Sequence, residues 1–214
     1  MRTAALIPTI YRPDGLRIAL QSLRNTAPDV VPVVACEQDD TEAPKIAEEF
    51  GAVLAVCEQY RAGCAYGWNT ALRAAQDFEL YVIASDDVEF LDGWLENAMI
   101  ALQKMDNSGL VGLRGNEAQE LSDFYMMSRD FIIKSHGGVA AVPHYEVWGV
   151  DTEACMRARR AGKYTVTKKQ CITHHRKLYQ PKLPPLDVRQ KTNWIYSTRE
   201  RQGFPNDFEA ILCE

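Results

Sequence analysis

The sequence predicts an α/β fold, in which a central sheet of the Rossmann type carries helices on both of its faces. Short, almost uninterrupted apolar segments alternate with helical segments through the first half of the chain, as in parallel sheets that are covered on both sides. The chain has 214 residues, of which 46% are hydrophobic and 25% charged, and this composition is typical of globular proteins. No apolar run approaches the roughly 18 to 20 residues that a membrane span requires.

Four apolar runs are the expected strands of the first half, each followed by a segment whose apolar residues recur at helical spacing. The strands are expected at residues 4–7, 30–35, 52–56 and 80–84, and the helices at 16–23, 43–50, 68–75 and 95–102. This regular alternation of strand and helix patterns ends after residue 105. Shorter strands are expected at 110–113, 124–127 and 164–167, with helices at 151–161 and 188–201. The prolines within residues 177–187 indicate a linker before the last helix.

Charge is distributed unevenly along the chain. Residues 1–156 hold 11 Lys and Arg against 24 Asp and Glu, whereas residues 157–201 hold 13 against 2. This basic segment predicts a polyanionic partner, either DNA or an acidic glycan. A membrane surface is disfavoured because residues 188–201 carry no clean apolar stripe. The six cysteines are scattered, and the first residues lack the pattern of a signal peptide, so we expect reduced thiols and a cytoplasmic location.

Polar residues follow the expected strands of the first half, where ligands bind in open α/β sheets. Acids gather after the second strand, in Glu37 to Asp40, and after the fourth, at Asp86 and Asp87. No G-x-G-x-x-G segment follows the first strand and no P-loop is present, so the common dinucleotide and NTPase motifs are missing.

Asp86 and Asp87 are adjacent carboxylates directly after an apolar strand. They repel each other unless a cation or hydrogen-bond donors compensate. A divalent metal that also binds substrate phosphates would do so. The alternative is an acidic turn that caps the next helix.

Asp151 lies at the start of an expected helix, on the same arc as Ala154, Cys155 and Ala158, whereas Arg157 and Arg159 lie opposite. It is either a helix cap or a catalytic base that faces a cavity. His174 and His175 are neighbours, so in a strand they point to opposite faces and only one could join a metal site with Asp87. They could equally be surface histidines in a basic stretch.

Five segments together resemble the family 2 glycosyltransferases of the GT-A fold, over about residues 3–176. They are Ile7 to Pro13, Glu37 to Asp40, Gly67 to Leu72, Ser85 to Val88, and Trp148 to Asp151 with Arg157 to Gly162. The resemblance implies a GT-A domain at 1–176, with a nucleotide-sugar-binding half at 1–105 and an acceptor and catalytic half at 106–176. Residues 177–214, a linker and basic tail, are not covered.

The resemblance also implies roles for single residues. Thr9, Tyr11, Asp39 and Asp86, with Arg61 in addition, would hold the nucleoside of the donor, a UDP-sugar. Asp87 would bind Mn²⁺ or Mg²⁺, with Asp86 and either His174 or His175 beside it, and Asp151 would be the catalytic base. One departure is that Ser85 or Ala84 stands where the family has another acid, two residues before the last Asp of its metal motif.

The function expected from these features is metal-dependent, inverting transfer of a sugar from a nucleotide sugar to a hydroxyl group. The acceptor would be a cell-envelope or other glycan, or a hydroxylated base in DNA, as in some viral enzymes. Two alternatives remain. A nucleotidyltransferase would be expected to carry a Gly-rich phosphate loop, and a non-catalytic nucleotide-sugar-binding module would have no need of a base at Asp151.

Overall fold

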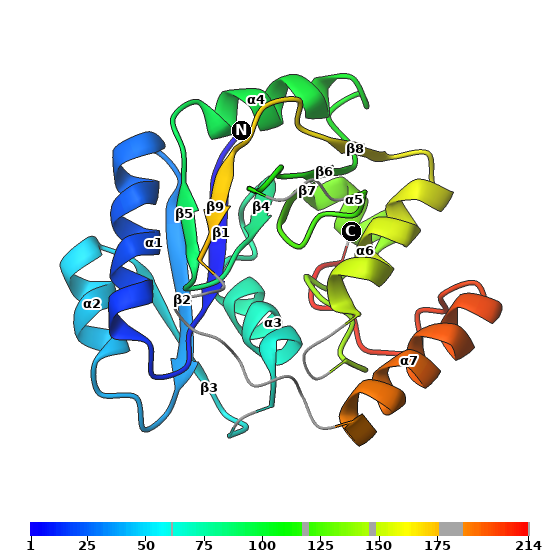
Figure 1. The fold of residues 1–214 in the computed structure, drawn as a ribbon, viewed down its shortest axis with the longest axis horizontal. Coiled ribbons are helices and arrows are strands. Elements are labelled where there is room, and N and C mark those ends of the chain that lie inside the picture. The colour runs from blue at the N-terminus through cyan, green and yellow to red at the C-terminus, as the bar shows by residue number, and fades with distance from the viewer. Residues whose placement is uncertain (61, 117–119, 146–148, 176–185, 214) are drawn as a thin grey trace.

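The structure, a computed structural model, describes residues 1–60, 62–116, 120–145, 149–175 and 186–213. Within this part of the chain a seven-stranded sheet has the order β3-β2-β1-β4-β7-β6-β8, and β5 pairs with β9 in a small second sheet (Figure 1). The strands are β1 (Thr3–Pro8), β2 (Val31–Glu37), β3 (Val53–Cys57), β4 (Leu80–Ile83), β5 (Val88–Phe90), β6 (Leu110–Gly112), β7 (Tyr125–Ser128), β8 (Tyr164–Val166) and β9 (Ile172–His174). The helices are α1 (Pro13–Thr26), α2 (Ala43–Phe50), α3 (Cys64–Ala74), α4 (Trp94–Gln103), α5 (Arg129–Ser135), α6 (Val150–Arg160) and α7 (Leu186–Arg201).

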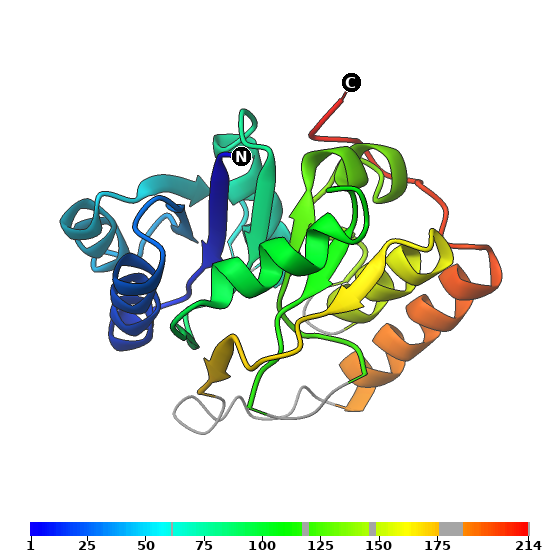
Figure 2. The same ribbon diagram turned by 90° about the horizontal axis from the view of Figure 1, so that it is seen from above.

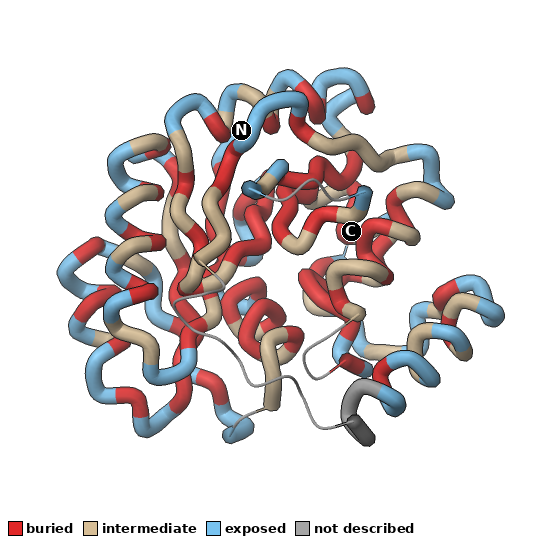
Figure 3. The backbone as a smooth tube through the Cα atoms, in the orientation of Figure 1, coloured by how far each residue is buried: buried red, intermediate tan, exposed pale blue. Residues whose placement is uncertain are grey.

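Helices cover both faces of the large sheet, as predicted (Figure 2). Alternate residues of β1 point to opposite faces, so that Ile7 packs with Leu20 of α1 and Trp94 of α4. Leu6 belongs to the other core, with Leu72 of α3 and Phe131 of α5. The buried residues of β1 and β4 run through the middle of the molecule, between the two helical layers (Figure 3).

The parallel arrangement expected for the strands of the first half is confirmed, and the sheet continues beyond them with one antiparallel strand. The strands β3, β2, β1 and β4 are parallel, but β7 is antiparallel to both β4 and β6. Residues 113–124 connect β6 to β7 without a described helix, and antiparallel neighbours need no helical crossover. Helix α5 and strands β5 and β9 were not expected from the sequence.

The last helix and the residues after it pack against the body of the molecule. Ile195 and Tyr196 of α7 contact the core on the α3 and α6 side of the sheet, and Leu212 is buried in it. Arg199 is also buried, with 4% of its surface exposed. The domain boundary predicted at residue 176 stays a prediction, but the described end of the chain is joined closely to α6. No helix in the described ranges is long and apolar enough to cross a membrane.

Candidate active site

The ends of β1 and β4 are joined by a hydrogen bond between two predicted site residues. Thr9 directly follows β1, and its hydroxyl donates to Asp86 Oδ2 at 2.8 Å. Both side chains are buried, with Asp86 only 3% exposed. The guanidinium of Arg12 lies 3.3 Å from Asp86 Oδ1. Burial raises the pKa of Asp86 to about 6, although Arg12 and Thr9 act in the opposite direction.

Helix α3 supports both of these strand ends. Gly67 faces Pro8 so closely that an added Cβ would lie 2.7 Å from the proline Cβ, so this position requires glycine. The next residue, Trp68, donates from Nε1 to the carbonyl of Ala84 at 2.6 Å, immediately before the acidic segment. Asn69 then binds the backbone of Ala140 and Ala141. The segment Gly67 to Asn69 therefore holds Pro8, Ala84 and the chain after α5 in fixed relative positions.

Tyr11 and Asp39 meet at the ends of β1 and β2. The hydroxyl of Tyr11 donates to Asp39 Oδ1, and this hydrogen bond raises the pKa of Tyr11. Tyr11 has a left-handed backbone conformation with φ of 51°, which is uncommon for a residue other than glycine. Its backbone N–H donates to Asp40 Oδ2 at 3.1 Å, while Asp40 Oδ1 accepts from two N–H groups at the start of α2. Arg61, the remaining predicted nucleoside contact, lies outside the described residues.

Asp87 and His174 form the second part of the site. The pairing of β5 with β9 aligns Val88 with His174, and it brings His174 Nε2 to 3.3 Å from Asp87 Oδ2. Ser85 also donates to Asp87. Burial alone would raise the pKa of Asp87, but the hydrogen bonds from His174 and Ser85, with the charge of Arg12, outweigh burial and lower it. The side chain of His175 lies elsewhere, with Nε2 at 2.9 Å from Glu89.

Asp87 and His174 could supply two side-chain ligands to a divalent cation that substrate phosphates also help to hold. Mg²⁺ in particular uses one or two carboxylates, with phosphate oxygens and water completing its shell. Among the described residues, no group of three or more His, Cys, Asp and Glu side chains forms a metal site by itself. Asp87 and His174 therefore fit a cation shared with a diphosphate, with Ser85 hydrogen-bonded to Asp87 beside them.

Asp151 lies in the first turn of α6, in contact with a carboxylate that the sequence analysis missed. The N-cap of this helix is Gly149, so Asp151 is not the cap, although it accepts a 2.8 Å hydrogen bond from the N–H of Thr152. Burial raises the pKa of Asp151 to about 6, and the charge of Asp123 and a hydrogen bond between the two carboxyl groups add to this effect. Trp148, the predicted wall beside it, lies outside the described residues.

Asp123 connects Asp151 with the metal-binding candidates. Its Oδ2 lies 3.7 Å from His174 Nδ1, and both residues line a small cavity of about 30 Å³ together with Arg114 and Asn116. Asp87, His174, Asp123 and Asp151 thus form a continuous chain of contacts. Asp123 belongs to no sequence motif, and its only signal in the sequence is its position just before the strand expected at 124–127.

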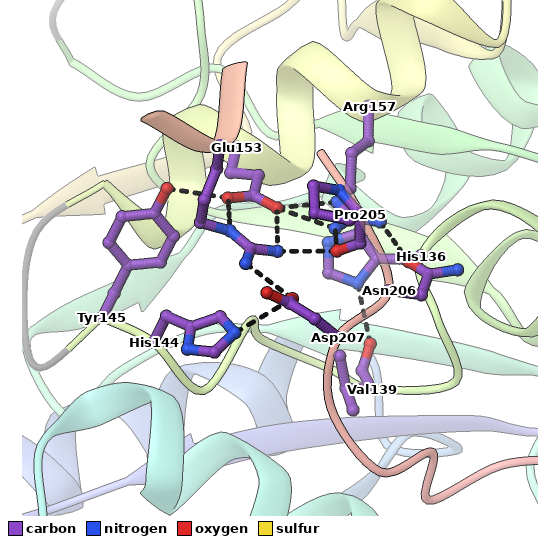
Figure 4. Close-up of polar contacts among 10 residues, drawn as sticks. His136, Val139, His144, Tyr145, Glu153, Arg157, Pro205, Asn206 and Asp207 are labelled. Carbon is purple, nitrogen blue, oxygen red and sulfur yellow. Dashed lines mark hydrogen bonds and ion pairs between the residues drawn. The ribbon is translucent and has the colours of Figure 1, made fainter. Parts of the chain in front are cut away.

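A buried cluster of charges fixes the helix that carries Asp151 (Figure 4). Glu153 is fully buried and accepts hydrogen bonds from Tyr145, Arg157 and Arg199 at 2.7 to 3.2 Å. Arg199 also reaches Asp207 Oδ1 at 2.6 Å. The expectation that Arg157 lies on the outer arc of α6 is wrong, because its pairing with Glu153 draws the guanidinium inward. At least two cations of the basic segment are thereby neutralised inside the protein.

Gly149 shows how closely the surrounding segments pack at the start of α6. Its φ of 88° lies in a region that favours glycine. A Cβ at this position would lie 2.8 Å from the ring of Tyr145 and 3.4 Å from Thr192 of α7. The beginning of α6 is therefore held from both sides, two residues before Asp151.

Comparison with solved structures identifies the fold. The structure of a fragment of S. aureus TarS matches 95% of this chain and 74% of its own, with a TM-score of 0.67 and 14% identity. Glucosyl-3-phosphoglycerate synthase from Mycobacterium tuberculosis matches 96% of this chain and 81% of its own, with a TM-score of 0.66 and 15% identity. Both are family 2 glycosyltransferases of the GT-A type. The chain has the GT-A fold.

This GT-A likeness rests on structure, because the identities are low. No protein-family model matches the sequence, and no curated protein sequence matches it either. In a longer structure of TarS the match spans 98% of this chain but 44% of TarS. The TarS fragment has been solved with UDP, and the mycobacterial synthase with UDP and Mn²⁺ or Mg²⁺ and with Mn²⁺ and UDP-glucose. The resemblance stated from the sequence is confirmed at the level of the fold.

Proposed function

We propose that this chain is a metal-dependent, inverting glycosyltransferase that transfers a sugar from a UDP-sugar to a hydroxyl acceptor. The observation that carries the proposal is the chain of contacts from Asp87 through His174 and Asp123 to Asp151. It brings a candidate for metal binding and a candidate base to one side of a GT-A sheet. The fold and the nucleotides bound by its structural neighbours support the same reading.

Thr9, Tyr11 and Asp39 would hold the nucleoside of the donor. Asp39 and the Tyr11 hydroxyl present polar atoms at the exposed end of the β1 and β2 pair. Thr9 and Arg12 fix the carboxylate of Asp86, which would face the ribose. Arg61 is proposed as an additional contact on the grounds of sequence alone.

Asp87 and His174 would bind Mn²⁺ or Mg²⁺ together with the diphosphate. When bound, the metal would neutralise the negative charge that develops on the leaving nucleoside diphosphate. The low pKa of Asp87 keeps this carboxylate ionised at neutral pH. His175 faces Glu89, so we propose His174 as the histidine at the metal.

Asp151 would accept the proton of the attacking hydroxyl group. A raised pKa is characteristic of a general base, because it brings the proton affinity closer to the working pH. Direct attack of the acceptor on the anomeric carbon inverts that centre and needs no second carboxylate as a nucleophile. The first half of the chain would thus bind the donor, and the second half would supply the base.

Incubation with a panel of nucleotide sugars, with and without Mn²⁺, tests this proposal through the products. Metal-dependent release of UDP is expected. Release of pyrophosphate from a nucleoside triphosphate and a sugar phosphate would indicate a nucleotidyltransferase instead. Tight binding of a UDP-sugar without turnover on any acceptor would indicate a binding module.

The acceptor is proposed to be either a glycan or a hydroxylated DNA base. Exposed Lys168, Lys169 and Arg201 are among the cations that remain for a polyanion, whereas Arg157 and Arg199 are used internally. If DNA is the acceptor, its binding should weaken steeply with salt, with a log–log slope of about −0.7 to −0.9 per phosphate contacted.

Neutralising these cations tests the DNA alternative without disturbing the interior. The triple substitution of Lys168, Lys169 and Arg201 by Gln should flatten the salt slope, whereas Lys45→Gln on α2 should not. Removal of the whole tail is unsuitable because it would also remove Arg199. Absence of DNA binding at about 50 mM salt, with transfer to a glycan, would exclude DNA as the acceptor.

A further inference from the structure

The imidazole of His174 lies between two carboxylates on different parts of the chain. Its Nε2 faces Asp87 at 3.3 Å, and its Nδ1 faces Asp123 at 3.7 Å. Asp87 follows β4, whereas Asp123 precedes β7, which is the antiparallel neighbour of β4. The topology of the sheet therefore brings the two acids to opposite edges of one ring.

Other contacts restrict how this ring can turn. The ring of Phe124 meets His174 edge-on, with 4.8 Å between ring centroids. The backbone N–H of His174 donates to Asn116 Oδ1 at 3.2 Å, and the β5 and β9 pairing sets its register. The side chain is about one-sixth exposed. With the ring position fixed in this way, the tautomer of the imidazole is still open. A neighbouring acceptor determines which ring nitrogen carries the proton.

We propose that Asp123 is a positioning residue, whose carboxylate 3.7 Å from Nδ1 of His174 favours the proton on that nitrogen and so directs the unprotonated Nε2 toward the cation at Asp87. This inference rests on the proposed function. Histidines that bind metals generally donate their second N–H to a carboxylate, a carbonyl or water, and this partner sets the tautomer and orientation of the ring. Because Asp123 also contacts Asp151, it would join the metal-binding end of the site to the catalytic carboxylate.

Substitutions test whether Asp123 acts through His174. The dissociation constant of Mn²⁺ in the presence of UDP is measured for Asp123→Ala, Asp123→Asn, His174→Ala and the Asp123→Ala/His174→Ala double variant. Asp123→Ala should weaken Mn²⁺ binding by about 10- to 100-fold. Asp123→Asn keeps an oxygen acceptor and should restore most of the affinity. The double variant should bind Mn²⁺ no more weakly than His174→Ala alone.

The matched control is Asp106→Ala, since this carboxylate is 97% exposed and lies outside the site. It should leave Mn²⁺ affinity unchanged. Unaltered affinity in Asp123→Ala, or additive losses in the double variant, would overturn the inference. Failure of the wild-type protein to bind Mn²⁺ with UDP would instead contradict the proposed function, and the inference with it.

A measurement on the unaltered protein covers the case in which Asp123→Ala does not fold. The chain has four histidines, so nitrogen NMR of ¹⁵N-histidine-labelled protein with Mg²⁺ and UDP can resolve His174, assigned by its absence in His174→Ala. We expect a protonated Nδ1 and an unprotonated Nε2. The opposite tautomer would overturn the inference.

Discussion

Arg199 Nε donates a 2.9 Å hydrogen bond to Glu153 Oε2, and this buried ion pair joins the last helix to the helix that carries Asp151. Two carboxylates, Glu153 and Asp207, balance the two guanidinium groups of Arg157 and Arg199 in this cluster (Figure 4). The C-terminal segment is consequently part of the support of the candidate base. Part of the positive charge of the basic segment is therefore used inside the protein and is not available to an external partner.

Arg199→Ala should therefore reduce the free energy of unfolding strongly. Removing one partner of a buried ion pair leaves an uncompensated charge, which costs about 3–5 kcal/mol. The matched control is Arg201→Ala on the same helix, at an exposed position, and its effect should stay within about 0.5 kcal/mol. Urea unfolding of the three proteins gives the comparison. Equal stabilities of the two variants would show that the cluster contributes little.

Asp87→Ala should nearly abolish transfer and remove the response to Mn²⁺. The variant would lack the carboxylate that lies beside His174, so the charge on the leaving diphosphate would no longer be compensated. Initial rates over a range of Mn²⁺ concentrations give the measurement, with exposed Asp92→Ala as the control. Full activity of Asp87→Ala in the presence of a chelator would remove the metal from the mechanism.

Asp151→Asn should leave donor binding close to that of the wild type and lower turnover by about 10²-fold or more. Asparagine retains the shape and the oxygen that accepts from the N–H of Thr152, but it cannot take up a proton. UDP-sugar affinity and kcat are measured on the same preparation. Unchanged turnover would reduce Asp151 to a structural role.

The pH dependence of kcat/KM should report the raised pKa of Asp151. Since its pKa is about 6, the carboxylate is lost as the pH falls through 6, and kcat/KM should then fall about tenfold per pH unit. The residual activity of Asp151→Asn should lack this decline. Asp86 also has a pKa of about 6, so a decline that persists in the variant would assign the titration to Asp86.

The strands of the first half of the chain were predictable because each is a nearly uninterrupted apolar run bounded by polar residues. The run at 80–84 led to β4 and to Asp86 and Asp87 at its end. The helix expected at 43–50 matches α2 for a different reason, the helical spacing of its apolar residues. Strands β6 and β8 are equally short, with three residues each, yet were expected, so length alone does not explain why β5 and β9 were missed. They depend on a pairing across the chain that no local pattern reveals.

Asp123 and Glu153 were missed for a related reason. The environment of Asp123 comes from His174 and Asp151, which are distant in sequence, and that of Glu153 comes from Arg199 and Tyr145. Long-range contacts also give His174 and His175 different neighbours, since the register of β9 against β5 directs His174 toward Asp87 and His175 toward Glu89.

Diffraction from crystals soaked with Mn²⁺ and UDP, recorded at the manganese absorption edge, tests the central claim most directly. We expect one strong anomalous peak within coordination distance of Asp87 Oδ2 and His174 Nε2, and of the diphosphate. The uracil and ribose should lie beside Tyr11 and Asp39. Ordered UDP at another edge of the sheet, or at this edge with no manganese between Asp87 and His174, would contradict the account.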